Sequence, residues 1–328
     1  YWQKLPDGKV QCTLCPRHCK LTEDQRGFCF VRADQNGEVV LTTYGRSSGF
    51  CVDPVEKKPL FHFLPGTPIL SFGTAGCNLG CVFCQNWDIS RSRETDNLQD
   101  DASPEMIART AKSLGCRSVA FTYNEPIVWY EYMYDIAKLA KEKGLRTVMV
   151  SSGYINPQPL EALLPYMDAV KVDLKSFNEE TYSQLIGGKL EPVLEIIKMV
   201  YQAKTWLEIV WLVVPGYTDN LEEIRQACLW LKENTSEEIP VHFSRFGPKY
   251  KLTNLPPTPE ETIKKARSVC LEAGMKYVYT GNVPGLPSKN TFCPKCGAVC
   301  IGRTNYIIHR HDKNGKCPKC KTKLDIID

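Results

Sequence analysis

The sequence predicts an α/β fold, a partial or full parallel (β/α) barrel with small cysteine-rich metal-binding appendages at both ends. Between residues 66 and 285, apolar β-branched runs alternate with helical patterns, as in sheets with helical crossovers. The cysteines instead gather near the two chain ends and in one early loop. With 328 residues and 43% hydrophobic residues, the chain can bury a large core. We therefore expect a metal-binding region over 1–65, a barrel over 66–285, and a zinc-ribbon or rubredoxin-like domain over 286–328.

The barrel prediction rests on repeated strand and helix patterns. Six apolar runs read as strands: 68–73, 117–123, 146–152, 169–174, 207–214 and 240–246. Four helical patterns lie between or after them: 103–115, 127–144, 220–234 and 258–274. Parallel strands end at one common edge, and active sites of such folds lie at that carboxyl edge. We therefore look for functional side chains just after each predicted strand.

Charge and cysteine usage exclude several classes of protein. The net charge is +4, which gives no reason to expect nucleic-acid or membrane binding. No apolar run reaches the roughly 18 residues of a membrane span. The 16 cysteines cluster in Cys-x-x-Cys patterns within a core-rich chain, which favours metal ligation in a reducing compartment over disulfides. A cytoplasmic protein is expected, with Cys116, Cys228 and Cys270 as ordinary buried residues.

The loop GCNLGCVFCQNW, residues 76–87, carries three thiols: Cys77, Cys81 and Cys84. Structural zinc sites and electron-carrying [4Fe-4S] clusters usually take four ligands. Three cysteines on a [4Fe-4S] cluster would leave one iron open to chelate a small molecule. The alternative is a structural zinc site that a distant cysteine, such as Cys51, completes. Glycines at 73, 76 and 80 favour a tight loop around a bulky group.

With its aromatic Phe83, the pattern Cys77-x3-Cys81-x-Phe83-Cys84 resembles the signature of the radical S-adenosylmethionine (SAM) superfamily. The stretches 53–66 and 277–285 resemble the AmmeMemoRadiSam group, which is related to pyruvate formate-lyase activating enzymes. The resemblance implies that SAM binds the open iron of a [4Fe-4S] cluster and is cleaved reductively. The products are methionine and a 5′-deoxyadenosyl radical that abstracts hydrogen from a substrate. An electron donor such as ferredoxin or flavodoxin is also implied.

The resemblance suggests cofactor-binding residues after the second and third strands. Glu125 stands where such enzymes carry the glutamate of a Gly-Gly-Glu element, and it would pair with the SAM ammonium. The alternative is a helix start, because Glu125-Pro126 suits a first turn. Ser151 and Ser152 resemble a Thr-Asn-Gly element and would meet the ribose or carboxylate of SAM. A plain turn explains these two serines equally well.

Later strands supply four more candidates by the same resemblance. Asp173 and Lys175 match an Asp-x-Lys element that binds a monovalent cation and the SAM carboxylate; the alternative is a structural salt bridge. Val214 is expected to pack near adenine. His242 matches a histidine near SAM, although a lone strand histidine is more often a satisfied core residue. Strand five carries Glu208 where the activating enzymes have an arginine, so that contact is not carried over.

The chain end predicts a four-thiolate metal site. Two Cys-Pro-x-Cys knuckles supply the ligands Cys293, Cys296, Cys317 and Cys320. Zinc ribbons and rubredoxin-like iron sites share this pattern, so the sequence leaves Zn and Fe open. Three other residues are alternative ligands: Cys300, His309 and His311.

The chain start holds a further set of four cysteines: Cys12, Cys15, Cys19 and Cys29. Their Cys-x2-Cys-x3-Cys-x9-Cys spacing predicts either a zinc ion or an auxiliary Fe-S cluster, and His18 is a possible substitute ligand. The spacing does not choose between these metals.

Three functions compete. The first is a radical SAM enzyme that abstracts hydrogen from an unidentified substrate. The second is an activating enzyme that installs a glycyl radical on a partner protein, which flanking domains over the barrel mouth would oppose. The third is a non-catalytic zinc protein that binds nucleic acid or protein, which the weak net charge and the polar strand ends oppose.

Overall fold

The computed structural model describes residues 1–91, 100–304 and 306–328. Its centre is an eight-stranded sheet in the order β15-β14-β13-β12-β11-β10-β8-β7. The strands are β7 (Phe50–Pro54), β8 (Pro68–Phe72), β10 (Ser118–Phe121), β11 (Arg146–Ser151), β12 (Ala169–Asp173), β13 (Trp206–Val213), β14 (Val241–Arg245) and β15 (Val278–Gly281). From β8 to β15 all pairs are parallel, and β7 pairs antiparallel with β8. The α/β prediction and its six strands are confirmed. The two edge strands are β7 and β15, so the sheet is open, as in a partial barrel.

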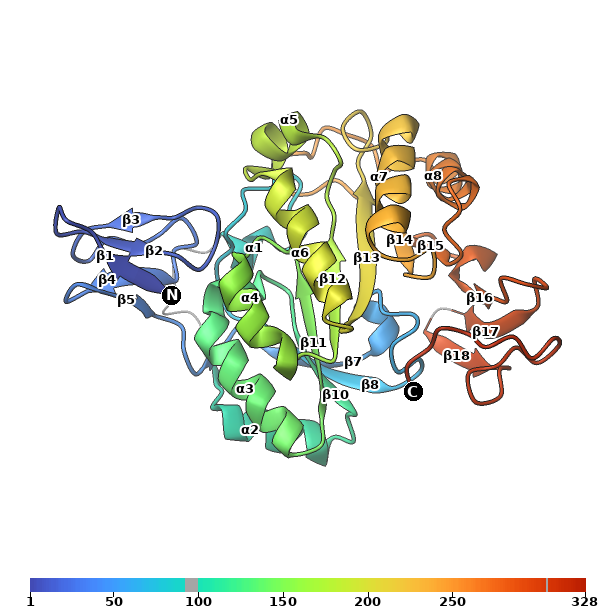
Figure 1. Cartoon of the computed structure of the whole chain (residues 1–328), viewed down its shortest axis with the longest axis horizontal. Coiled ribbons are helices and arrows are strands. Elements are labelled where there is room, and N and C mark those ends of the chain that lie inside the picture. Colours follow the sequence, from blue (N-terminus) through green and yellow to red (C-terminus); the bar gives the residue numbers. More distant parts are fainter. Residues whose placement is uncertain (92–99, 305) are drawn as a thin grey trace.

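Helices follow the strands around this sheet (Figure 1). They are α1 (Trp87–Ser90), α2 (Pro104–Ser113), α3 (Tyr130–Glu142), α4 (Pro157–Leu163), α5 (Glu179–Thr181), α6 (Leu190–Gln202), α7 (Leu221–Asn234) and α8 (Glu260–Glu272), with short turns η3 (Pro126–Trp129) and η5 (Tyr182–Ile186). The sequence patterns did not predict α4 and α6. Pro157, Pro159 and Pro192 lie in their first turns, where proline is tolerated but weakens a helical pattern.

Small sheets flank the main one. The N-terminal part holds β1 (Trp2–Lys4), β2 (Val10–Cys12) and β3 (Lys20–Leu21), then the hairpin β4 (Arg32–Gln35) and β5 (Glu38–Leu41). β6 (Arg46–Ser47) pairs with β9 (Asp100–Asp101), and the C-terminal sheet is β16 (Thr291–Phe292), β17 (Val299–Thr304) and β18 (Ile307–Arg310). Figure 1 shows the N-terminal and C-terminal sheets on opposite sides of the central sheet. Because β7 joins that sheet, part of the range 1–65 contributes to the barrel.

Polar contacts attach both flanking parts. The buried Arg32 forms a two-bond ion pair with Glu131 of α3, with both N···O distances 2.7 Å. Such bidentate pairs fix geometry as well as charge. At the other end, the Ile327 amide donates to the His62 carbonyl (2.8 Å), and the Leu64 amide donates to the Ile327 carbonyl (2.7 Å). The chain end therefore extends the backbone pairing of a barrel loop.

One cysteine prediction was wrong. Cys228 of α7 and Cys270 of α8 form a disulfide, although each reads as an isolated buried residue in the sequence. The two helices pack against each other, and the sequence separation of 42 hides this pairing from local patterns. Cys116 is buried, as expected. In the described ranges, no helix is long and apolar enough to cross a membrane.

Candidate functional site

The three-cysteine loop follows β8 and lines a cavity at the carboxyl ends of the strands. Cys77, Cys81 and Cys84 all border this cavity, together with Phe83. Gly76 opens the loop with φ +84°, and an added Cβ there would collide with the carbonyl of Cys29. A residue with a side chain would be strained in this conformation and would also clash. The loop therefore requires glycine where the sequence supplies it.

Asn124, three residues after the end of β10, braces the start of the loop. Its Oδ1 accepts from the Thr74 amide (3.0 Å), and its Nδ2 donates to the carbonyls of Ala75 (2.8 Å) and Gly76 (2.9 Å). The Asn124 side chain is buried. The sequence does not assign Asn124 a role among the candidate site residues. A polar amide at the end of a buried strand was the signal that could have found it.

Two thiols of this loop, Cys77 and Cys81, have raised pKa values and so favour the neutral form on their own. Burial raises the pKa of Cys77 well above its usual value, and nearby Glu125 raises it further. Burial also raises the pKa of Cys81, although Lys175 offsets part of the shift. Iron binding requires thiolates, so a cation must compensate this cost. Three thiols around one cavity form a donor set that fits an iron-sulfur cluster.

Glu125 and the two serines form one hydrogen-bonded unit beside the cysteines. Ser151 Oγ donates to Glu125 Oε1 (2.6 Å), and Ser152 donates to Oε2 through its amide (2.9 Å) and hydroxyl (2.5 Å). The Ile127 amide donates to Oε1 (3.3 Å), so Glu125 also caps η3. Burial raises the pKa of Glu125, and the serine bonds hold it down in part. Glu125 therefore starts η3, as the helix-start alternative expects, and it also borders the cavity.

The end of β12 carries a charged triad. Asp173 pairs with Lys171, and with Lys175 at 3.4 Å between Nζ and Oδ2. Burial alone would raise the pKa of Asp173, but the two lysines hold it below its usual value. Burial would lower the pKa of Lys175, yet Asp173 keeps it raised. All three side chains border the cavity with the cysteines, and the triad has a net charge of one positive unit.

Two predicted residues lie outside that cavity lining. Val214 is fully buried just past β13, and its amide donates to Thr218 Oγ1 (2.8 Å). His242 is buried and bonds through Nε2 to Glu208 Oε2 (2.7 Å). Glu208 also accepts from the backbone amide of Phe61 (2.9 Å), so it organises a loop as well as the histidine. The cavity wall instead includes residues that sequence reasoning missed: Thr122, Val210, Leu212 and Ser244.

The four C-terminal knuckle thiols converge on one point. All four Sγ atoms lie within 4.8 Å of one another, with 3.5 Å between Cys293 and Cys320 and 3.6 Å between Cys296 and Cys317. A bond from the Thr322 hydroxyl lowers the pKa of Cys320 to about 6, which favours a metal-binding thiolate. This group could hold a metal ion. The alternative ligand Cys300 lies outside it, and its Sγ donates to the Ala298 carbonyl (3.5 Å).

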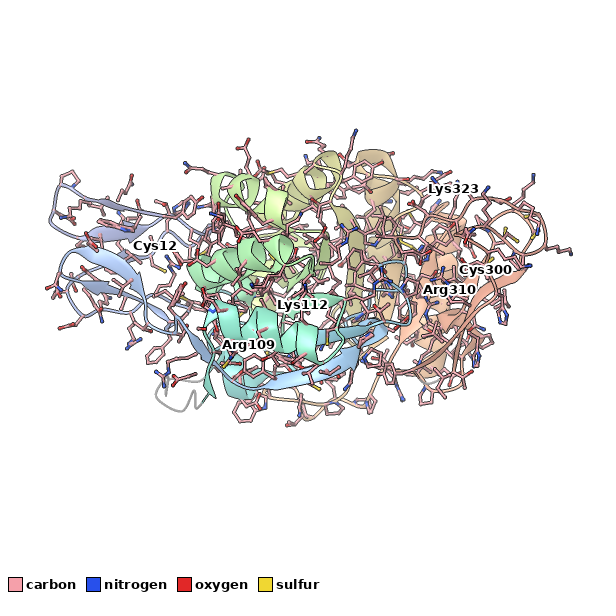
Figure 2. All side chains as sticks on the ribbon, turned by 90° about the horizontal axis from the view of Figure 1, so that it is seen from below. Cys12, Arg109, Lys112, Cys300, Arg310 and Lys323 are labelled. Atoms are coloured by element: carbon pink, nitrogen blue, oxygen red, sulfur yellow. A yellow bond between two sulfur atoms is a disulfide. The ribbon has the colours of Figure 1, made fainter. Side chains whose placement is uncertain are left out.

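The four N-terminal cysteines line one enclosed cavity at the other end of the molecule. Figure 2 shows Cys12 and Cys300 near its two opposite ends, so the two cysteine sets are separate sites. Burial raises the pKa of Cys15 to about 12 and that of Cys29 to about 11. A bound metal cation would favour the thiolate forms of Cys15 and Cys29, as it would for Cys77 and Cys81.

Comparison with known proteins decides the family. The model of the Radical SAM superfamily matches residues 72–228, which include the cysteine loop and the triad. An uncharacterized protein of Methanocaldococcus jannaschii is 42% identical over 330 aligned positions, covering 100% of this chain and 98% of that protein. The chain belongs to the radical SAM superfamily. This membership makes it a radical SAM enzyme and implies a [4Fe-4S] cluster and SAM as its cofactors.

Other radical SAM relatives are more distant. The pyruvate formate-lyase 1-activating enzyme of Escherichia coli K12 is 24% identical over 230 residues, or 66% of this chain and 93% of that enzyme. A structure of TYW1 with a lysine-pyruvate adduct bound has a TM-score of 0.50 at 16% identity, covering 73% of this chain and 88% of that one. Streptococcus suis SuiB bound to precursor peptide SuiA has a TM-score of 0.51 at 15% identity, covering 66% and 48%. The two structures share the fold.

Proposed function

We propose that the protein cleaves SAM reductively and uses the resulting radical to abstract hydrogen from a substrate that is not yet identified. The observation that carries this proposal is the shared cavity. Three loop thiols, a buried glutamate unit and a charged triad border it together at the carboxyl edge of the sheet. A structural zinc site would not need this polar lining. The protein would work in the cytoplasm with a ferredoxin-type or flavodoxin-type donor.

Cys77, Cys81 and Cys84 would hold the [4Fe-4S] cluster. When bound and reduced, that cluster supplies the electron that splits SAM into methionine and a 5′-deoxyadenosyl radical. The chain's own task is to bind, orient and keep water away. The buried loop and its Asn124 brace support this task, because they hold three ligands on a backbone with little freedom.

The polar groups of the cavity would orient the amino-acid part of SAM. Glu125 would accept the ammonium through oxygens that Ser151 and Ser152 now bind, with the serine hydroxyls turning to share them. Lys175 would attract the SAM carboxylate, since the triad carries one positive charge in excess. Asp173 would keep Lys175 in place and is the ligand that a monovalent cation would use.

An apolar strip would take the adenine ring. Val210 and Leu212 border the cavity from β13, and alternate residues of a strand share one face. Val214 continues this alternation but is fully buried beyond the strand end. We therefore assign the adenine contact to Leu212, with Val214 packed behind it. His242 would act on the site indirectly, through Glu208 and the loop that Glu208 holds.

The test is anaerobic formation of 5′-deoxyadenosine. Protein reconstituted with iron and sulfide is mixed with SAM and a strong reductant, and the product is measured by chromatography. Wild-type protein and the control Cys116→Ala, a buried cysteine outside the cavity, should release 5′-deoxyadenosine. Cys81→Ala should release none. Release from Cys81→Ala at the control rate would overturn the proposal.

Similarity to the pyruvate formate-lyase 1-activating enzyme supports one more specific candidate. The alignment covers 93% of that enzyme at 24% identity, so an activating reaction on a partner protein is the alternative function. In this reading the radical would remove hydrogen from a glycine of a partner protein. Incubation with a glycyl-radical enzyme, SAM and reductant should then give a glycyl-radical signal in electron paramagnetic resonance. The same mixture without that signal, but with 5′-deoxyadenosine, would favour another substrate.

A single metal ion, zinc or iron, is proposed for the C-terminal knuckles. The convergence of the four thiols supports one ion rather than a cluster. The knuckle cysteines pack in one buried cluster with Leu324 and Ile326 near the C-terminus. This position supports a structural role for the metal ion, in which metal binding contributes directly to folding.

A further inference from the structure

The cysteine groups of this protein have two different geometries. At the C-terminal knuckles, all four Sγ atoms lie within 4.8 Å of one another. In the rest of the described chain, the cysteines of the loop and those of the N-terminal set do not gather this closely. Instead, each of these two sets lines the wall of a cavity. The N-terminal thiols thus share their arrangement with the cluster-binding loop, and not with the knuckles.

Metal–sulfur distances explain why this difference matters. Four thiolates around one tetrahedral metal, with bonds of about 2.3 Å, stand about 3.8 Å apart. The knuckle distances of 3.5 and 3.6 Å are close to this value. A [4Fe-4S] cluster takes one thiolate per iron, at the corners of a larger body. Its thiolates must therefore surround a space, which is what the N-terminal cysteines do.

The wall of the N-terminal cavity supplies what a buried anionic cluster needs. Apolar residues complete it, and they would keep water away from the metal: Leu14, Leu21, Ile127 and Val128. Arg32 also lines the cavity and is buried. Its two terminal nitrogens bind Glu131, whereas its Nε has no hydrogen-bond partner within the described residues. This buried N–H is therefore a donor that an anionic group in the cavity could accept from.

This cavity lies directly against the radical SAM loop. Cys77 and Leu79 border the SAM cavity, whereas Asn78 between them borders the N-terminal cavity. Arg17, from the N-terminal loop, donates to the Asn78 carbonyl, and Gly76 packs on the backbone of Cys29. Residues 77–79 thus contribute to the walls of both cavities.

We propose that Cys12, Cys15, Cys19 and Cys29 bind an auxiliary iron-sulfur cluster of the [4Fe-4S] type, with Arg32 Nε as a hydrogen-bond donor to it. The cluster lies behind the SAM-binding loop. This site is independent of the proposed reaction, because it uses none of the three loop cysteines.

The experiment removes the loop site and asks what metal remains. The triple variant Cys77→Ala/Cys81→Ala/Cys84→Ala is produced anaerobically and reconstituted with iron and sulfide. Iron, zinc and acid-labile sulfide are counted per chain, and spectra are recorded after reduction. We expect about four sulfides and at least four irons per chain, with the visible absorption of a [4Fe-4S] cluster. One zinc and no sulfide at the N-terminal cysteines would overturn the proposal.

Further variants assign the remaining cluster to its ligands. Adding Cys15→Ala to the triple variant should abolish the sulfide, whereas adding the control Cys51→Ala, an exposed cysteine, should leave it unchanged. If the Cys15→Ala protein fails to fold, Arg32→Lys in the triple variant provides the second test. It keeps the charge but lacks Nε, and it should shift the reduction potential of the cluster. Full sulfide after a folded Cys15→Ala exchange, or an unchanged potential in Arg32→Lys, would contradict the ligand set or the Arg32 contact.

Discussion

Replacement of Asn124 by alanine tests how the cysteine loop is held. The change removes three hydrogen bonds, to the Thr74 amide and to the carbonyls of Ala75 and Gly76. A hydrogen bond contributes about 0.5–1.5 kcal/mol net, so three contribute about 1.5–4.5 kcal/mol. The Thr74 amide and the Gly76 carbonyl are buried and have no other partner among the described residues. We therefore expect a loss of about 3 kcal/mol in the free energy of unfolding.

The assay combines urea unfolding with iron analysis. Unfolding midpoints at unchanged slope give the difference in stability, and iron per chain after reconstitution reports on the loop. Asn220→Ala is a matched control, because Asn220 caps α7 by accepting from the amides of Glu222 (2.9 Å) and Glu223 (3.2 Å). Loss of that cap should cost about 1 kcal/mol and leave the iron content unchanged. Asn124→Ala should lose stability and also most of the loop iron.

A third variant separates the two halves of the brace. Asn124→Asp keeps an acceptor for the Thr74 amide but loses both donors, and it sets a carboxylate against two carbonyl oxygens. It should therefore bind as little loop iron as Asn124→Ala. If Asn124→Ala is no less stable than Asn220→Ala and holds the wild-type amount of iron, Asn124 does not hold the cysteine loop.

Three further changes test other parts of the molecule. Burial lowers the pKa of His62 from 6.5 to about 4, so the neutral histidine makes its full contribution to stability above pH 6.5 and loses it as the pH drops toward 4. The free energy of unfolding should therefore fall by about 2 kcal/mol between pH 7.5 and 5. His62→Phe should remove that part of the pH dependence in urea unfolding, and an unchanged pH profile would contradict it. Cys293→Ser should release the knuckle metal and expose the C-terminal domain to proteolysis, whereas Cys300→Ser should keep both metal and resistance; equal behaviour of the two would refute the ligand set. Gly76→Ala should destabilise the protein by about 1–2 kcal/mol or more because of its positive φ and the clash with Cys29, and wild-type stability would be evidence against that contact.

The sequence predicted the sheet well because its strands are buried. Strands covered on both faces read as continuous apolar runs, and all six such runs are strands. The edge strand β7 was not predicted. In β7, the apolar Val52 is exposed, whereas the charged Asp53 is buried in an ion pair with Lys58. Hydrophobicity therefore does not follow burial along this strand, and the sequence shows no amphipathic alternation. Its assignment depends on pairing with β8, which local patterns do not show.

The candidate site was predictable one residue at a time, but its connections were not. The loop cysteines are local in sequence, so their spacing, together with the resemblance to the family signature, was enough to propose them as cluster ligands. Glu125 and Ser151 were proposed separately as SAM contacts, yet they bond to each other across 26 residues. The Asn124 brace joins segments 48 to 50 residues apart. Such contacts follow from strand adjacency, which becomes visible once the sheet order is known.

The adenine contact on β13 is still a prediction. The resemblance points to Val214, and Leu212, two residues earlier in the same alternation, borders the cavity. The AmmeMemoRadiSam subgroup remains a prediction from short sequence stretches.

We propose that SAM would bind to a cluster held by Cys77, Cys81 and Cys84. The most direct measurement is electron-nuclear double resonance on the reduced protein with SAM labelled at its amino nitrogen. We expect a coupling between that nitrogen and the electron spin of the cluster, and the loss of this coupling in Cys84→Ala. Saturating labelled SAM with no such coupling, in protein that holds its full iron content, would contradict the claim.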